Sequence, residues 1–150
     1  MESTAVNPQA GRRKHLDAAL LVLRVGIGVM FIAHGWPKLT GGPEVWAKIG
    51  GAMGTFGIEF APAFWGFLAA LTETLGGALL ILGLLARPAA ALLLIVMFVA
   101  ASMHIGKDDP FNVYSHAVEA GITFLFLLIA GGGDWAVGRH VPGLRKTWAR

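Results

Sequence analysis

The stretch Leu16–Ala33, which reads LDAALLVLRVGIGVMFIA, decides the fold that we expect for this chain. It holds 18 residues, and an α-helix of that length rises about 27 Å, close to the thickness of the hydrocarbon core of a bilayer. The basic cluster Arg12-Arg13-Lys14 precedes it, as at the start of a cleaved signal peptide, but no A-x-A cleavage pattern follows. We therefore interpret Leu16–Ala33 as a retained helix that spans a membrane.

Three more apolar stretches follow this helix along the chain. They are Pro62–Leu85, Ala89–His104 and Asn112–Ala130. Of the 150 residues, 55% are hydrophobic and only 14% are charged, and the mean hydropathy of +0.65 is too high for a soluble domain. We predict an all-α fold, a four-helix transmembrane bundle with a long extracytoplasmic loop between helices 1 and 2. That loop, Gly35–Glu59, contains a segment around Val45–Ile49 that is typical of an interfacial amphipathic helix.

Lysines and arginines are distributed unevenly between the two ends of the predicted helices. One end, formed by both tails and the turn before the third helix, carries Arg12, Arg13, Lys14, Arg87, Arg139, Arg145, Lys146 and Arg150. The other end carries Lys38, Lys48 and Lys107, beside Glu44, Glu59, Asp108 and Asp109. Because cytoplasmic segments are enriched in Lys and Arg, we predict that both termini are cytoplasmic. The chain then divides into an N-terminal tail (1–15), a membrane domain (16–133) and a basic C-terminal tail (134–150).

The composition excludes several classes of function. The chain has no cysteine, so thiol catalysis, disulfide exchange and cysteine-ligated metal are excluded within it. Its net charge of +3 comes without a basic stretch interleaved with aromatic residues, so we expect no nucleic-acid partner. Gly26-Ile27-Gly28 lies inside an apolar run with no preceding strand, so it is not a dinucleotide loop. We expect Gly26, Gly28, Gly76 and Gly77 to let helix backbones approach closely instead.

Three ionisable side chains fall inside the predicted membrane layer. At about 1.5 Å per residue, Arg24 and Glu73 lie near the midplane and Glu119 lies in the outer half. Each charge costs roughly 2.5–3.5 kcal/mol at the bilayer centre, so we expect Arg24 to pair with Glu73, with Glu119 as a second partner. Two interpretations stay open. The group is either a structural clasp between helices or a site for a polar ligand, protons or a quinone head group.

Three histidines, His34, His104 and His116, are predicted near the outer ends of different helices. No two of them share i, i+3 or i, i+4 spacing on one helix, so the pattern does not predict a metal site. Each is either a helix-end residue hydrogen-bonded to water and loop, or a contact for a ligand or a proton.

Two longer motifs resemble those of a known family. The first is Arg24-x-x-x-Gly28-x-x-Phe31-x-x-His34-Gly35-x-x-Lys38-Leu39, and the second is Glu73-x-x-Gly76-Gly77-x-Leu79-Leu80-x-x-Gly83. With a third helix that follows Arg87 and ends in His104, and with Glu119 in the fourth, they are similar to the DoxX family of four-helix membrane proteins. The resemblance covers about residues 16–133. The chain departs from the family where Gly131-Gly132-Gly133-Asp134-Trp135 replaces the usual Gly-Pro-Gly turn and Ser-Leu-Asp stretch.

The resemblance implies a multi-pass protein of a bacterial inner membrane, related to the membrane subunit of thiosulfate:quinone oxidoreductase. We therefore expect a membrane subunit of a quinone-linked oxidoreductase system for sulfur or oxidative-stress chemistry, with quinone as cofactor and no metal or flavin. The candidate catalytic residues are Glu73, Glu119 and His104, and the candidate ligand-binding residues are Arg24, His34, Lys38 and His116. The alternatives are a non-catalytic scaffold or assembly factor and a small transporter. The expected partners are the lipid bilayer, a redox partner protein and further copies of the chain.

Overall fold

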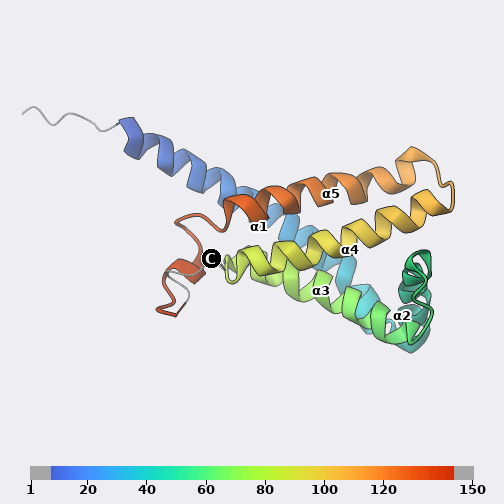
Figure 1. Cartoon of the computed structure of the whole chain (residues 1–150). Coiled ribbons are helices and arrows are strands. Elements are labelled where there is room, and N and C mark those ends of the chain that lie inside the picture. The colour runs from blue at the N-terminus through green and yellow to red at the C-terminus, as the bar shows by residue number, and fades with distance from the viewer. Residues whose placement is uncertain (1–7, 144–150) are drawn as a thin grey trace, which may run out of the picture.

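Four long helices form the body of the computed structural model, which describes residues 8–143 (Figure 1). In chain order the elements are α1 (Pro8–Thr40), α2 (Gly42–Gly50), the 3-10 helix η1 (Gly51–Phe56), α3 (Pro62–Leu82), α4 (Ala86–Gly106), α5 (Phe111–Ala130) and the 3-10 helix η2 (Val137–Arg139). The four long helices run roughly along one direction, and α2 packs across the end of the bundle near the start of α3 (Figure 1). The predicted all-α bundle with four long apolar helices is confirmed.

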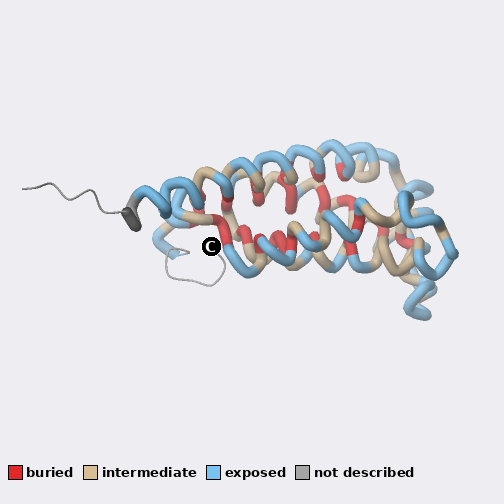
Figure 2. The backbone as a smooth tube through the Cα atoms, turned by 90° about the horizontal axis from the view of Figure 1, so that it is seen from above, coloured by how far each residue is buried: buried red, intermediate tan, exposed pale blue. Residues whose placement is uncertain are grey.

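The four long helices are apolar enough, as well as long enough, to cross a membrane. Buried residues lie on the sides of the helices that face one another, and the outward sides are exposed (Figure 2). The exposed sides carry large apolar side chains such as Val22 and Val29 on α1 and Leu92 and Phe98 on α4. Lipid rather than water is the solvent that suits such a surface, so the chain is a multi-pass membrane protein with four candidate spans.

The first helix is longer at both ends than the sequence predicts. It begins at Pro8, so the part of the expected tail that the structure describes is helical, and it continues through Pro37 to Thr40. A proline usually ends a helix because it lacks an N–H and its ring crowds the preceding turn. Here contacts with α3 hold the last turns in place, since Gly35 lies directly against Glu73 and Thr74. The predicted loop therefore starts about six residues later than Gly35. Arg145, Lys146 and Arg150 lie outside the described residues.

The turn between α3 and α4 differs from its predicted bounds because Gly83 ends α3. Gly83 adopts a left-handed conformation with φ of 65°, and the Leu84 N–H donates to the Leu79 carbonyl at 2.9 Å. This is the glycine-based end of a helix in which the last carbonyls find partners in the turn. Arg87 and Pro88 then lie in the first turn of α4, where a proline is tolerated.

Close helix contacts depend on small residues, as predicted, although only at some of the predicted positions. Gly28 of α1 and Gly77 of α3 lie so close that a Cβ on either would come within 2.6 Å of the other's carbonyl oxygen. Gly76 faces Leu93 of α4, whereas Gly26 faces open space. Within a bilayer, such a close approach of two backbones gives the dispersion contacts that hold transmembrane helices together.

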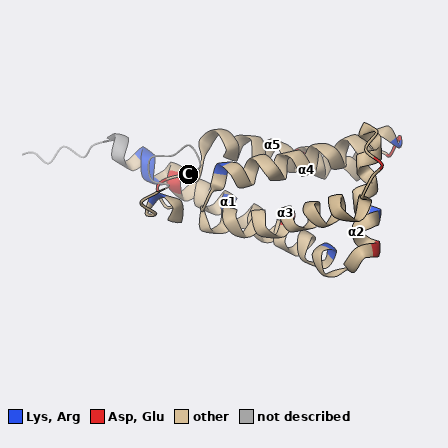
Figure 3. Cartoon of the chain, turned by 60° about the horizontal axis from the view of Figure 1, so that its bottom comes forward, with Lys and Arg blue, Asp and Glu red and all other residues tan. Residues whose placement is uncertain are grey.

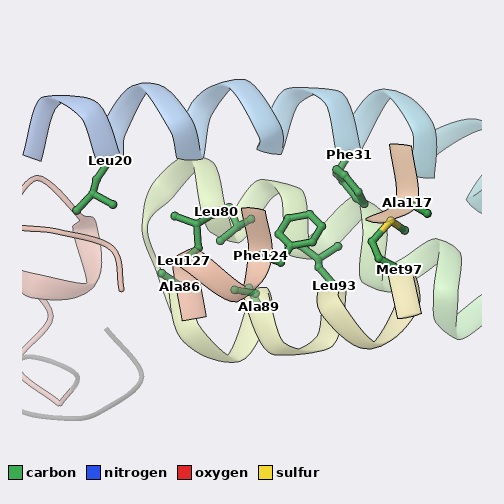
Figure 4. Packing of buried hydrophobic residues seen from close by; sticks show 11 residues of the cluster. Leu20, Phe31, Leu80, Ala86, Ala89, Leu93, Met97, Ala117, Phe124 and Leu127 are labelled. Atoms are coloured by element: carbon green, nitrogen blue, oxygen red, sulfur yellow. The ribbon is translucent and has the colours of Figure 1, made fainter. Parts of the chain in front are cut away.

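The core lies between all four long helices. Leu80 of α3, Leu93 of α4 and Phe124 and Leu127 of α5 are fully buried there (Figure 4). Phe31 of α1 reaches across to Phe124, with the ring centroids 4.7 Å apart in an edge-to-face arrangement. This contact joins the first and last helices, and it shows that Phe31 and Phe124 lie at the same level of the bundle.

Most charged residues lie toward the two ends of the bundle, and the ribbon between the ends is mainly uncharged (Figure 3). At one end the Asp17 carboxylate accepts a hydrogen bond from the Asp134 N–H at 2.8 Å, and the Gly138 N–H donates to the Gly83 carbonyl at 3.2 Å. The N-terminal half of α1, the α3–α4 turn and residues 131–139 therefore share this end, as the charge pattern predicts. Which side of a membrane the end occupies stays a prediction.

Candidate functional site

A cavity of about 420 Å³ lies where α2, η1, α3 and α4 meet. Its walls are mainly apolar, and they include Leu68 of α3 and Leu92, Ile95 and Val99 of α4. Leu68, Leu92 and Ile95 are also exposed on the outside of the bundle, so the cavity borders the surface that faces lipid. The polar side chains that reach it include Lys38, Lys48, Trp65, Thr72, Glu73 and His104.

Glu73 is the buried charge of this cavity. It lies eleven positions after Pro62 in the middle of α3, and its side chain is only 4% exposed. Lys38, in the last turn of α1, extends its ammonium group to both carboxylate oxygens at 2.8 and 2.7 Å. The lysine side chain is 36% exposed, so the pair joins a desolvated anion to a cation that still reaches the cavity. Removing either partner would leave the other as an uncompensated charge in apolar surroundings.

Trp65 contributes a free hydrogen-bond donor to the cavity wall. Its indole N–H is buried and has no acceptor among the residues that the structure describes. Its ring packs edge-on against Phe60 and Phe64, with centroids 5.9 and 5.3 Å away. Buried polar groups in folded proteins are nearly always hydrogen-bonded, and buried tryptophans usually find an acceptor. The indole N–H is therefore an unused donor of a residue that lines the cavity.

His104 lines the cavity near the end of α4, and the neighbouring turn orients its ring. The Nδ1 atom of His104 lies 2.7 Å from a carboxylate oxygen of Asp109. When Nδ1 carries the proton of this hydrogen bond, Nε2 is left as an acceptor that faces away from Asp109. Asp109 does not cap α5, which begins after Pro110 and has no side-chain cap.

The helix α2 closes one side of the cavity through a contact that allows no side chain. A Cβ on Gly66 of α3 would lie 1.8 Å from the Trp46 carbonyl oxygen, and one on Gly50 would lie 1.8 Å from the Pro62 carbonyl oxygen. The indole N–H of Trp46 also donates to the Lys38 carbonyl at 3.0 Å. These contacts hold α2 against α3 and tie it to the residue that pairs with Glu73.

Most of the cavity is built from a segment that matches a known family. A sequence model of the DoxX family matches residues 19–105. This chain belongs to the DoxX family. The matched segment contains Lys38, Trp65, Glu73 and His104, so the polar groups of the cavity lie in the part of the chain that DoxX proteins share, whereas α5 lies beyond the match. Comparison with curated proteins and with solved structures gave no match.

Arg24 of this DoxX protein lies at the other end of the bundle from the cavity, and its predicted pairing with Glu73 is wrong. Arg24 is fully buried. One guanidinium nitrogen donates to the Leu80 and Ile81 carbonyls at 3.0 and 3.3 Å, and the other approaches the Trp135 carbonyl at 3.5 Å. The depth estimate failed because α1 runs on to Thr40, which places Arg24 about 24 Å from the outer end of its helix rather than about 15 Å.

The other candidate residues do not converge on the cavity. His34 is exposed, and its Nδ1 atom lies 2.8 Å from the Met30 carbonyl oxygen of its own helix. His116 and Glu119 are exposed on α5, so Glu119 is not a partner of Arg24. No three His, Asp or Glu side chains come together as metal ligands in the described part of the chain.

Sequence reasoning missed three features of the DoxX cavity. It gave Trp65 and Asp109 no role at the site, and it paired Glu73 with the wrong cation. The orphaned indole N–H depends on what surrounds Trp65 in space and has no sequence signal. The i, i+5 spacing of His104 and Asp109 across a helix end is a signal that could have been read.

Proposed function

We propose that this DoxX protein is the membrane subunit of a quinone-linked oxidoreductase system, and that its cavity holds the quinone head group. The observation that carries the proposal is the buried Glu73 carboxylate, held by the Lys38 ammonium at 2.7 Å inside an apolar cavity that borders lipid. Charged groups within membrane helices are costly and usually mark a functional site. This pair lies in the cavity wall.

The chemistry of the cavity suits a quinone. A quinone ring is flat and apolar, and it carries two carbonyl oxygens that accept hydrogen bonds. The apolar walls fit the ring, and the Trp65 indole N–H and the Lys38 ammonium are donors for its oxygens. The exposed apolar residues at the mouth, such as Leu92 and Ile95, would let an isoprenoid tail remain among the lipids.

Protons are the second requirement, because reduction of a quinone to a quinol takes up two electrons and two protons. Glu73 and His104 both line the cavity, and a carboxylic acid and an imidazole are the usual proton carriers. Asp109 holds the His104 ring, so the free ring nitrogen has a fixed direction. The chain has no cysteine to serve as a thiol donor, and the electrons would come from a reduced substrate or a redox partner protein.

Trp65→Phe tests the donor role of the indole. We expect the variant to fold and to retain quinone about 2- to 10-fold less tightly, the effect of losing one hydrogen bond in an apolar site. The measurement is the affinity for a short-chain quinone, together with the amount of quinone that copurifies in mild detergent. Trp36→Phe is the matched control, because Trp36 is exposed near the end of α1 and does not line the cavity. Equal quinone binding by both variants would contradict the role of Trp65.

Glu73→Gln tests whether the ion pair serves the ligand or the fold. The amide that replaces the carboxylate carries no charge, so the Lys38 ammonium loses its counter-ion in the cavity and can turn toward water, and we expect quinone affinity to fall about 10-fold or more. Folding is checked in parallel by helical circular dichroism and elution as a single species. Loss of quinone from a folded variant supports the proposal, and loss of folding would favour a structural clasp.

A non-catalytic scaffold is the second candidate, and one observation favours it. Glu119 and His116 are polar and exposed on a helix that is long enough to span the membrane. Exposed polar residues on such a helix are typical of a surface that another protein covers. A wild-type preparation that copurifies a partner protein and contains no quinone would support the scaffold and contradict the redox proposal.

A further inference from the structure

One face of α5 is polar within a segment long enough to span the membrane. Glu119 lies eight positions after Phe111, which places it about 12 Å from that end of the helix. Its side chain is exposed, and its carboxylate has no hydrogen-bond or ion-pair partner in the described part of the chain. A charge that faced lipid at this depth would carry the insertion penalty of roughly 2–3 kcal/mol with nothing to offset it. The face is therefore expected to be covered.

Other polar side chains lie on the same side of α5. Asn112 and His116 are exposed. The polar residues are spaced three or four positions apart, which places them on one face of the helix: Asn112, then Ser115 and His116, then Glu119. The opposite side of α5 is committed to the core through Ala117, Phe124 and Leu127. The polar face is thus separate from the packing that holds the bundle together.

The outward face of α4 lacks this feature at a comparable level. Near this level α1 exposes His34 and Trp36, and the His34 ring is held by the Met30 carbonyl of its own helix. On α4 the exposed residues include Leu92, Ile95 and Phe98. These side chains are suited to lipid as they stand. Glu119 is an exposed carboxylate well inside a helix that can span the membrane. We therefore expect a protein partner to cover the outer face of α5.

We infer that α5 packs against α5 of a second copy of this chain, through the face that carries His116 and Glu119. A twofold contact requires a surface that is complementary to itself. This face meets the requirement, because it carries an acceptor, Glu119, three positions from a donor, His116. Around a twofold axis along the membrane normal, each Glu119 carboxylate faces the partner's His116 imidazole across a height difference of about 4.5 Å, within reach of both side chains.

Disulfide crosslinking tests this contact directly, because the chain has no cysteine of its own. Ile122→Cys places a thiol on the same outward face of α5, and Val29→Cys places one on the lipid-facing side of α1. The two positions lie at similar levels, since Phe31 contacts Phe124. In vesicles of purified protein at low protein-to-lipid ratio, we expect oxidation to give a covalent dimer with Ile122→Cys and little dimer with Val29→Cys.

Variants of the polar pair test its chemistry. We expect Glu119→Leu and His116→Ala each to weaken dimerisation about 10- to 400-fold, because one polar contact between membrane helices is worth about 3- to 20-fold and either change removes both contacts of the twofold pair. The double variant is expected to dimerise no more weakly than the weaker of the two single variants, because both changes break the same pair of contacts. Since neither side chain has a partner among residues 8–143, all three variants should keep the wild-type circular dichroism.

Three outcomes would overturn the inference. One is a wild-type protein that stays monomeric in the vesicles, and another is equal crosslinking through Ile122→Cys and Val29→Cys. The third is crosslinking of Ile122→Cys in native membranes only to a different protein, which would assign the face to a heterologous partner. These outcomes leave the quinone proposal intact, because Glu119 and His116 do not line the cavity.

Discussion

Arg24→Met is expected to destabilise the protein by about 3 kcal/mol, because hydrogen bonds made by a buried charged group contribute roughly 1.5–3 kcal/mol each. Arg24 is fully buried and donates to the Leu80 carbonyl at 3.0 Å and the Ile81 carbonyl at 3.3 Å. These carbonyls belong to the last turn of α3, where the helix dipole is negative and a cation is favoured. The side chain thereby ties α1 to the end of α3.

The measurement is reversible unfolding in mixed micelles, followed by circular dichroism. Arg12→Met is the matched control, since Arg12 is an exposed arginine on the same helix, and we expect its stability to equal that of the wild type. A buried ion can sometimes be replaced by a well-packed apolar side chain without loss. Equal stability of Arg24→Met and the wild type would mean that Arg24 is dispensable for the fold.

Gly66→Ala is expected to displace α2 from α3 and to abolish the cavity. The added Cβ would lie 1.8 Å from the Trp46 carbonyl oxygen and 2.6 Å from its carbonyl carbon. Both are backbone atoms, so the clash cannot be relieved by a side-chain rotation and the two helices must separate. Overpacking of this kind costs about 1–3 kcal/mol or more. Because α2 forms one wall of the cavity, we expect quinone binding to be lost while the four long helices remain.

Limited proteolysis reports the displacement, because Lys48 in α2 is a trypsin site. We expect cleavage at Lys48 to be much faster in Gly66→Ala than in the wild type. Gly54→Ala is the matched control, since a Cβ at Gly54 of η1 would meet nothing within 4 Å. Wild-type cleavage and quinone binding in Gly66→Ala would contradict the role of the glycine contact.

The two halves of the candidate site differ in how far they could be predicted. Glu73 could be singled out from the sequence because a carboxylate in the middle of an apolar stretch is conspicuous on its own. Its partner could not, because Arg24 and Lys38 lie on the same helix and only their levels relative to α3 distinguish them. The levels of Arg24 and Lys38 depend on where α1 ends. The helix continues past Pro37 because Gly35 packs against α3.

The sequence by itself determined the number of long apolar helices, the presence of glycines for close helix packing and membership of the DoxX family. These properties depend on composition and spacing along one segment at a time. Only the tertiary structure decided that Glu73 pairs with Lys38, that Trp65 keeps an unused donor and that Glu119 faces outward. Each of these depends on how one helix is rotated and shifted relative to another. Contacts between residues far apart in the sequence set that rotation and shift, so no single segment encodes them.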